Sequence, residues 1–198
     1  MLCSFHRTES DRRARVAVRV SGTWLRGTLA GAPRVALFVL LAPAAVAQSI
    51  RPSQPALVAQ DIGRAHVEIA YHRPVARNRL LFGALVPWNR PWSPSADTAA
   101  RFSTTALIQI NGAPLPPGTY SLFAIPDSLS WTFVFSSKYP AHHLAFRDRV
   151  EVLRVTSIPR HEAYMETLGF YFPTVDADSA DLVLHWGTTV VSMHITAR

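Results

Sequence analysis

Cysteine is nearly absent from this chain of 198 residues. The single cysteine, Cys3, stands at the very start, so no disulfide can form within the chain. Downstream of it there is no thiol nucleophile either. The fold must therefore be held together by its hydrophobic core alone, and a domain of about 150 residues is large enough to bury such a core.

Sequence motifs of known chemistry are absent as well. The chain has no Gly-x-Ser-x-Gly turn, no phosphate-binding lysine loop and no Gly-x-Gly-x-x-Gly. His161-Glu162 fails as a zinc motif, because Met165 stands where the second histidine is required. The run Asp176-x-Asp178-x-x-Asp181 lacks the glycine and glutamate of a calcium loop, and we interpret it as an acidic turn. We expect no cofactor and no metal, although a zinc site or a catalytic triad assembled from distant loops would leave no such trace.

Long hydrophobic runs are limited to one segment near the start. Residues 35–47, followed by Gln48, have the apolar core and Ala-x-Ala ending of a secretory signal peptide. As a helix they would span roughly 20 Å, less than the ~30 Å of a bilayer core. We predict a signal peptide over residues 1–47 with cleavage after Ala47, and no stable membrane insertion of the rest.

The 34 residues before this apolar run are unusually many for a signal peptide. One hypothesis is a start codon assigned too early, with initiation near Val18, Val20 or Leu25. An extended arginine-rich leader is the alternative. Either one gives the same mature protein.

Most of the excess positive charge lies in this leader. The whole chain carries a net charge of +7, but residues 1–47 hold seven of the 20 basic and two of the 13 acidic residues. That leaves 13 basic and 11 acidic residues, a net charge of +2, after cleavage. We therefore expect no nucleic-acid partner.

Strand signals dominate the remainder, and helical periodicity is scarce. Short apolar or alternating segments follow one another, separated by turn markers such as Asn111-Gly112. We predict nine strands: 56–61, 66–72, 100–110, 119–125, 131–136, 150–158, 164–172, 181–186 and 189–196. Only Leu80 to Leu85 and Pro140 to Arg149 could form short helices. The prediction is an all-β fold, an antiparallel β-sandwich in a single domain over residues 48–198.

The last two strands allow a prediction of register. If Gly187-Thr188 is a two-residue hairpin turn, Trp186 lies opposite Thr189 and Asp181 lies opposite His194. One face then carries five large apolar side chains that must face the core: Leu182, Leu184, Trp186, Val191 and Met193. The other carries Asp181, Val183, His185, Val190, Ser192 and His194.

Several segments resemble a known family. They are Tyr71-His72-Arg73-Pro74, Arg79 to Trp88, Leu115 to Pro126 and Trp131-Thr132. Together they resemble a bacterial exported family known only as domain of unknown function 2911, over about Arg51 to Thr196. The resemblance implies a mostly β protein that is periplasmic or secreted, and it brings no established activity. After Trp92 the family reads Arg-x-Gly-Ala-Asn-Glu-Ala, whereas this chain reads Ser93 to Ala99, so a function of that arginine and glutamate would be lost or altered here.

The segment from Ile69 to Ala96 is the most unusual part of the chain. It contains no carboxylate, but four arginines, a histidine and two tryptophans, and its prolines restrict the backbone. Such a set suits a carboxylate, phosphate or sugar ligand. The candidate ligand-binding residues are His72, Arg73, Arg77, Arg79, Trp88, Trp92 and Asp97. In the alternative interpretation Phe82, Leu85, Trp88 and Trp92 only cover an open end of the sandwich.

These observations favour a non-catalytic binding module for a small anionic or sugar-like ligand, or for a partner in the cell envelope. Two alternatives stay open. One is a small hydrolase that uses His72 and Asp97 as its acid and base. The other is a structural component of the envelope, which would expose a broad apolar patch.

Overall fold

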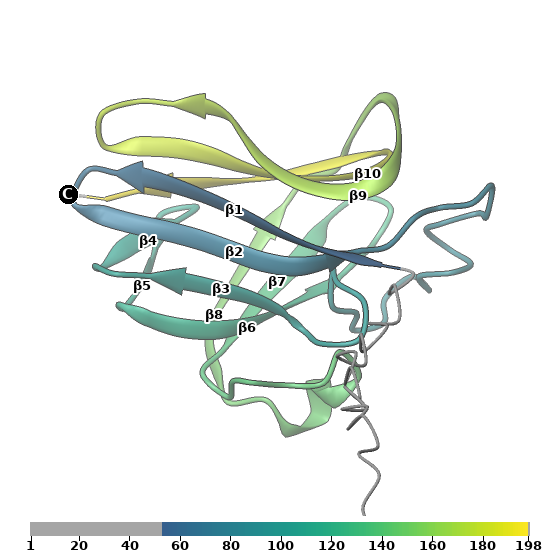
Figure 1. Ribbon diagram of the computed structural model, residues 1–198, viewed down its shortest axis with the longest axis horizontal. Helices are drawn as coiled ribbons and strands as arrows, with labels where there is room; N and C mark the ends of the chain where they lie inside the picture. The colour runs from purple at the N-terminus through teal and green to yellow at the C-terminus, as the bar shows by residue number, and fades with distance from the viewer. Residues whose placement is uncertain (1–52, 198) are drawn as a thin grey trace, which may run out of the picture. The chain divides into compact units, whose positions relative to one another are not determined.

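The computed structural model describes residues 53–197, which form a sandwich of two antiparallel sheets (Figure 1). One sheet has six strands in the order β1-β2-β3-β6-β7-β8, and the other has four in the order β5-β4-β10-β9. Their bounds are β1 Gln54–Ile62, β2 Ala65–Arg73, β3 Ala100–Thr104, β4 Ile108–Ile110, β5 Ala113–Leu115, β6 Gly118–Ile125, β7 Trp131–Ser136, β8 Glu151–Ser157, β9 Arg160–Val175 and β10 Ser179–Thr196. The predicted all-β sandwich is confirmed; the predicted signal peptide lies outside the described residues.

Two sequence predictions are wrong in detail. The single strand expected over 100–110 is two strands, β3 and β4, which belong to different sheets, and the short β5 was not predicted. The Asn111-Gly112 turn that leads into β5 has φ of 49° and 82°, as a tight hairpin turn requires. No helix forms over residues 80–85, and residues 140–149 contain only a 3-10 turn, Ala145–Asp148. Within residues 53–197 no helix is long or apolar enough to span a membrane.

Strand β10 folds back on itself near Gly187, whose φ is +61°. Asp181 Oδ1 lies 2.8 Å from His194 Nδ1, and the Ala197 amide donates to the Asp178 carbonyl at 2.8 Å. In a straight strand Asp181 and His194 would be roughly 40 Å apart. Both contacts fit the predicted register.

The burial of β10 agrees with that register on one face only. All five side chains predicted to face the core are buried: Leu182, Leu184, Trp186, Val191 and Met193. On the opposite face Val183, His185 and Val190 are buried as well. β9 pairs with β10 both before and after the reversal, and Gly187 of the expected turn is buried while Thr188 is exposed. The His185 ring lies 3.0 Å from the Ala163 carbonyl and 3.3 Å from the Tyr171 hydroxyl of β9.

The core is continuous between the two sheets. Along β2, alternate residues Ala65, Val67, Ile69 and Tyr71 are buried, as expected for a strand with one face on the core. The hydroxyl of Tyr71 accepts a hydrogen bond at 2.9 Å from the amide of Phe170 in the opposite sheet. No disulfide is needed to join the layers.

The connection after β2 links both sheets at one end of the sandwich. In Figure 1 it extends beyond the strand ends, on the side away from the C-terminus. The Pro74 carbonyl and the Ala76 amide bond to Leu168 and Glu166 of β9, at 3.0 and 2.8 Å. The chain then returns to the other sheet, where Trp92 exchanges two backbone hydrogen bonds with Ala124 of β6. Residues 74–92, the bridging loop, are therefore tied to both layers.

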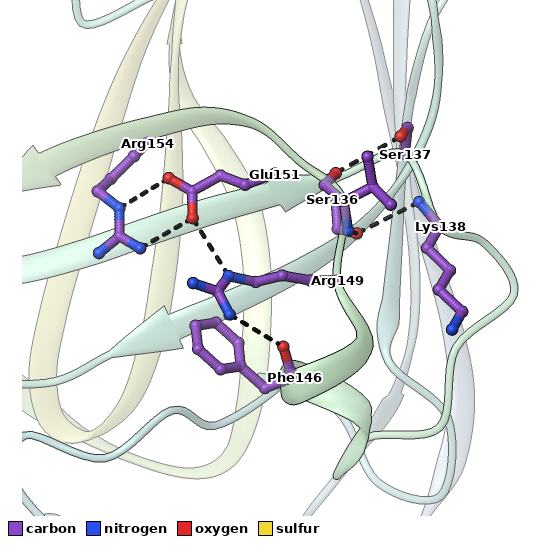
Figure 2. A network of polar contacts seen from close by, with 8 residues as sticks. Ser136, Ser137, Lys138, Phe146, Arg149, Glu151 and Arg154 are labelled. Carbon is purple, nitrogen blue, oxygen red and sulfur yellow. Dashed lines mark hydrogen bonds and ion pairs between the residues drawn. The ribbon is translucent and has the colours of Figure 1, made fainter.

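The edge strand β8 takes part in an ion-pair network of three charged residues, Arg149, Glu151 and Arg154. Glu151 accepts hydrogen bonds from Arg154 at 2.9 Å and from Arg149 at 3.2 Å (Figure 2). The Arg149 guanidinium also lies 4.0 Å above the ring of Phe146. The hydrogen bond from Arg154, followed by that from Arg149, lowers the pKa of Glu151 to about 2, against an ordinary value near 4.5.

Acidification should therefore weaken the fold through Glu151. Its pKa is lower in the folded than in the unfolded chain, so its stabilising contribution is complete above about pH 4.5 and is lost as the pH falls toward 2. For this partly exposed network we expect about 1 kcal/mol. Urea unfolding of Glu151→Gln at pH 7 and at pH 2.5 should show that difference at pH 7 and little at pH 2.5. An equal difference at both values would contradict the assignment.

Candidate functional site

Two clefts are lined in part by residues of the bridging loop. The first, which we call the arginine cleft, has a volume of about 340 Å³ and is lined by Arg77, Arg79, Leu85, Trp92, Ser95 and Trp186, among others. The second, the tryptophan cleft, has a volume of about 390 Å³ and is lined by Arg79, Phe82, Trp88, His161, Tyr164 and Thr189, among others. Arg79 and Trp186 line both clefts, so the two adjoin.

Arg79 is fixed in place by its own loop. Its Nε donates to the Ala76 carbonyl at 2.8 Å, and its Nη2 donates to the Val75 carbonyl at 2.7 Å. A guanidinium has five N–H groups in a rigid plane, so three remain after these two bonds. The loop therefore holds a cation at the junction of the two clefts with donors still available for an anion.

Arg77 is held through its backbone and not through its side chain. Its φ is 52°, and its amide donates to Glu166 Oε1 at 2.6 Å. Among residues 53–197 its guanidinium has no hydrogen-bond or ion-pair partner, and the residue is exposed on the rim of the arginine cleft. This positive charge is thus uncompensated by any carboxylate in direct contact.

Glu166 of β9 is the carboxylate that the Arg77 amide contacts, and both of its oxygens are already engaged. The Arg77 amide occupies Oε1, and the Tyr164 hydroxyl donates to Oε2 at 2.6 Å. The bond from Tyr164 lowers the pKa of Glu166 most, followed by that from the Arg77 amide and by the nearby charge of Arg79. The same bond raises the pKa of the Tyr164 hydroxyl. Glu166 is therefore ionised at neutral pH and fastens the loop to β9.

Aromatic rings form the floor between the clefts. Phe82 is the centre, with ring centroids 4.9 Å from Trp131, 6.0 Å from Trp88, 6.1 Å from Trp186 and 6.2 Å from Trp92. Trp92 and Trp186 stack nearly parallel at 6.0 Å, with an angle of 11°. Trp186 also donates through Nε1 to the Glu166 carbonyl at 3.2 Å. This packing gives both clefts a rigid apolar base.

The predicted site residues divide into several places. Arg77, Arg79 and Trp92 line the arginine cleft, whereas Trp88 joins Arg79 in the tryptophan cleft. Arg73 is turned to β9, where its Nε donates to the Leu168 carbonyl at 3.0 Å. Neither cleft lining includes His72 or Asp97, which were the basis of the hydrolase alternative.

His72 and Asp97 belong to a neighbouring region of the surface. The His72 ring lines a third hollow of about 210 Å³ and lies 3.4 Å from the Thr98 hydroxyl. Asp97 is exposed, with φ of 66°, and its backbone carbonyl is 2.7 Å from the His143 ring. Among residues 53–197 there is no group of three or more side chains that could hold a metal ion.

The packing interpretation of the loop is correct for some aromatic and apolar residues and incorrect for others. Phe82 and Trp92 pack on the core, and Leu81 and Val86 are buried. Leu85 and Trp88, by contrast, are 42% and 39% exposed. The loop therefore both closes the sandwich and presents apolar surface to solvent.

The site residues that β9 and β10 contribute were not predicted from the sequence. Glu166, Tyr164 and His161 come from β9, and Trp186 comes from β10. No local signal marks them, because they meet the bridging loop only through long-range strand pairing.

Comparison with known proteins supports the resemblance seen in the sequence. Residues 53–195 match the family described as protein of unknown function DUF2911. No curated protein and no solved structure matches the chain. The match includes the whole bridging loop and nearly all of the sandwich, and the chain therefore belongs to the DUF2911 family.

Proposed function

We propose that this is an exported binding protein and that the arginine cleft holds the anionic group, a carboxylate or a phosphate, of a small ligand. The observation that carries the proposal is the anchoring of Arg79. Two backbone carbonyls fix its guanidinium, and three N–H groups are left over beside the free side chain of Arg77. A planar guanidinium matches the two oxygens of a carboxylate or phosphate.

The charge balance of the cleft supports an anion. Its charged lining consists of Arg77 and Arg79, and no carboxylate lines it. Glu166 stands behind the loop with both oxygens engaged by other donors. An incoming anion would thus meet two cations and displace no existing ion pair.

The stiffness of the loop also favours binding. Because the Arg79 guanidinium is held before the ligand arrives, little of its conformational entropy is lost on association. The apolar wall of Leu85 and Trp92 lowers the local polarity, which strengthens a charged hydrogen bond. The volume of about 340 Å³ is in the range of small-molecule sites.

Arg77→Ala is the cleanest test, because its side chain supports no other part of the described fold. NMR titration of the parent with inorganic phosphate and with acetate should give saturable shifts at the cleft. We expect Arg77→Ala to weaken both by about tenfold, the effect of losing one charge-assisted hydrogen bond of about 1.5 kcal/mol.

Arg90→Ala is the matched control for net charge. Arg90 is exposed in the same loop and lines neither cleft, so its removal should leave both affinities within about twofold. Arg79→Lys keeps the charge but not the planar fork, and should weaken binding as well. Equal loss in Arg77→Ala and Arg90→Ala, or no saturable shift in the parent, would contradict the proposal.

A further inference from the structure

We infer that the ligand is an acidic saccharide, whose carboxylate binds Arg79 and whose sugar ring lies on the exposed indole of Trp88 in the tryptophan cleft. The inference rests on the proposed function for the carboxylate and adds the sugar ring and the second cleft. Because Arg79 lines both clefts, a ligand held by its guanidinium reaches the tryptophan cleft without crossing the loop.

Trp88 is a rigid aromatic surface. Its indole packs so closely on Gly83 that a Cβ there would lie 2.6 Å from Nε1, and Gly83 has φ of +88°. The ring is also tilted against Phe82 at 6.0 Å, and the next amide, Asn89, donates to the Pro126 carbonyl at 2.8 Å. Yet 39% of Trp88 remains exposed. An indole fixed on one side and open on the other can receive the flat C–H face of a pyranose ring.

Polar residues line the tryptophan cleft together with Trp88. The side chains of His161, Thr189 and Ser128 line the tryptophan cleft. Within residues 53–197 none of the three has a side-chain hydrogen-bond partner, so each can bond a sugar hydroxyl. A mostly apolar cleft with a few free polar groups is the usual form of a small-molecule site.

The chemistry of both clefts together selects the ligand class. A simple carboxylate would use Arg79 and leave the exposed Trp88 and the free hydroxyls without a role. A neutral sugar would use Trp88 and leave the two arginines without an anion. A hexuronic acid combines an apolar ring face, hydroxyls at its rim and a carboxylate on carbon 6. Its volume is compatible with the tryptophan cleft, at about 390 Å³.

Three probes separate the contribution of the sugar ring to binding from that of the carboxylate. Galacturonate carries both groups, galactose carries the ring alone, and acetate carries the carboxylate alone. In calorimetric or NMR titrations of the full chain, we expect galacturonate to bind about tenfold tighter than either galactose or acetate. Trp88→Ala should remove most of that advantage, by about five- to tenfold, and leave acetate binding unchanged.

Two further variants keep the test decisive. Trp88→Phe retains a ring and should keep part of the advantage even if Trp88→Ala disturbs the loop. Leu144→Ala removes a side chain that is 75% exposed at a distance from both clefts and should change nothing. The inference is overturned if galacturonate binds the parent no tighter than acetate, or if Trp88→Ala keeps the full advantage. If acetate and phosphate also fail to bind, the proposed function fails with it, so the two failures are distinguishable.

Discussion

Trp186→Ala is expected to lower the free energy of unfolding by about 3–5 kcal/mol, the usual cost of removing a large aromatic side chain from a core. Trp186 is only 1% exposed and stacks on Trp92, so its loss leaves a cavity under both clefts. The hydrogen bond from its indole to the Glu166 carbonyl disappears as well. Urea unfolding followed by circular dichroism measures the difference.

Two variants show whether the cost comes from this packing. Trp88→Ala removes the same side-chain type from a position in the bridging loop that is 39% exposed, so it should cost clearly less, about 1–2 kcal/mol. Trp186→Phe keeps part of the apolar volume but loses the indole donor, so it should fall between the parent and Trp186→Ala. Equal costs for Trp186→Ala and Trp88→Ala would contradict the assignment of the cost to the buried packing of Trp186.

Gly63→Ala should destabilise the fold by about 2–4 kcal/mol for two independent reasons. Gly63 is the first residue of the two-residue turn between β1 and β2, and its φ of +55° costs a residue with a side chain about 1–2 kcal/mol. In addition, a Cβ on Gly63 would lie 2.5 Å from the backbone oxygen of Ala197. The end of β10 would have to move, and the hydrogen bond between the Ala197 amide and Asp178 with it.

Gly112→Ala measures the cost of positive φ alone, without a clash at the added Cβ. Gly112 also has positive φ, +82°, but a Cβ there meets nothing within 4 Å. We expect it to cost only the conformational strain of about 1 kcal/mol. Thermal unfolding of both variants should place Gly63→Ala clearly below Gly112→Ala; the reverse order would contradict the close approach between the β1–β2 turn and the end of β10.

Much of the sandwich was predictable because strand signals are local. Strand β7 has the predicted bounds, Trp131 to Ser136, since alternating large apolar residues lie between turn markers on both sides. The register of the last segment followed from one positive-φ glycine, Gly187, and from two-residue periodicity. The contact between Asp181 and His194, which are 13 positions apart in the sequence, confirms this register.

The larger errors of prediction concern contacts between segments that are distant in the sequence. Ala100 to Ile110 reads as one strand, and nothing in its pattern marks the crossing from one sheet to the other. β9 pairs with β10 on both sides of the reversal at Gly187, and Val183 and His185 are buried on a face that the periodicity leaves open. Sheet assignment depends on which strands pair, and one sequence does not specify the pairing of distant segments.

The candidate site was predicted in part for the same reason. The arginines and tryptophans of the bridging loop are visible as an unusual local composition, and Arg77, Arg79 and Trp92 do line one cleft. Which arginines were free was not predictable. Arg73 is bound to the Leu168 carbonyl, and Glu166 reaches the loop from a strand 89 residues further along the chain than Arg77.

Indole resonances offer the most direct test of an anion held between Arg77 and Arg79. When galacturonate is titrated and proton–nitrogen correlation spectra are recorded at each step, we expect saturable shifts of the Trp92 and Trp88 indole signals and of the Arg79 Nε–H. The Trp131 indole, which is completely buried, should stay in place. Shifts confined to residues around His72 and Asp97, with Trp92 and Arg79 unmoved, would contradict it.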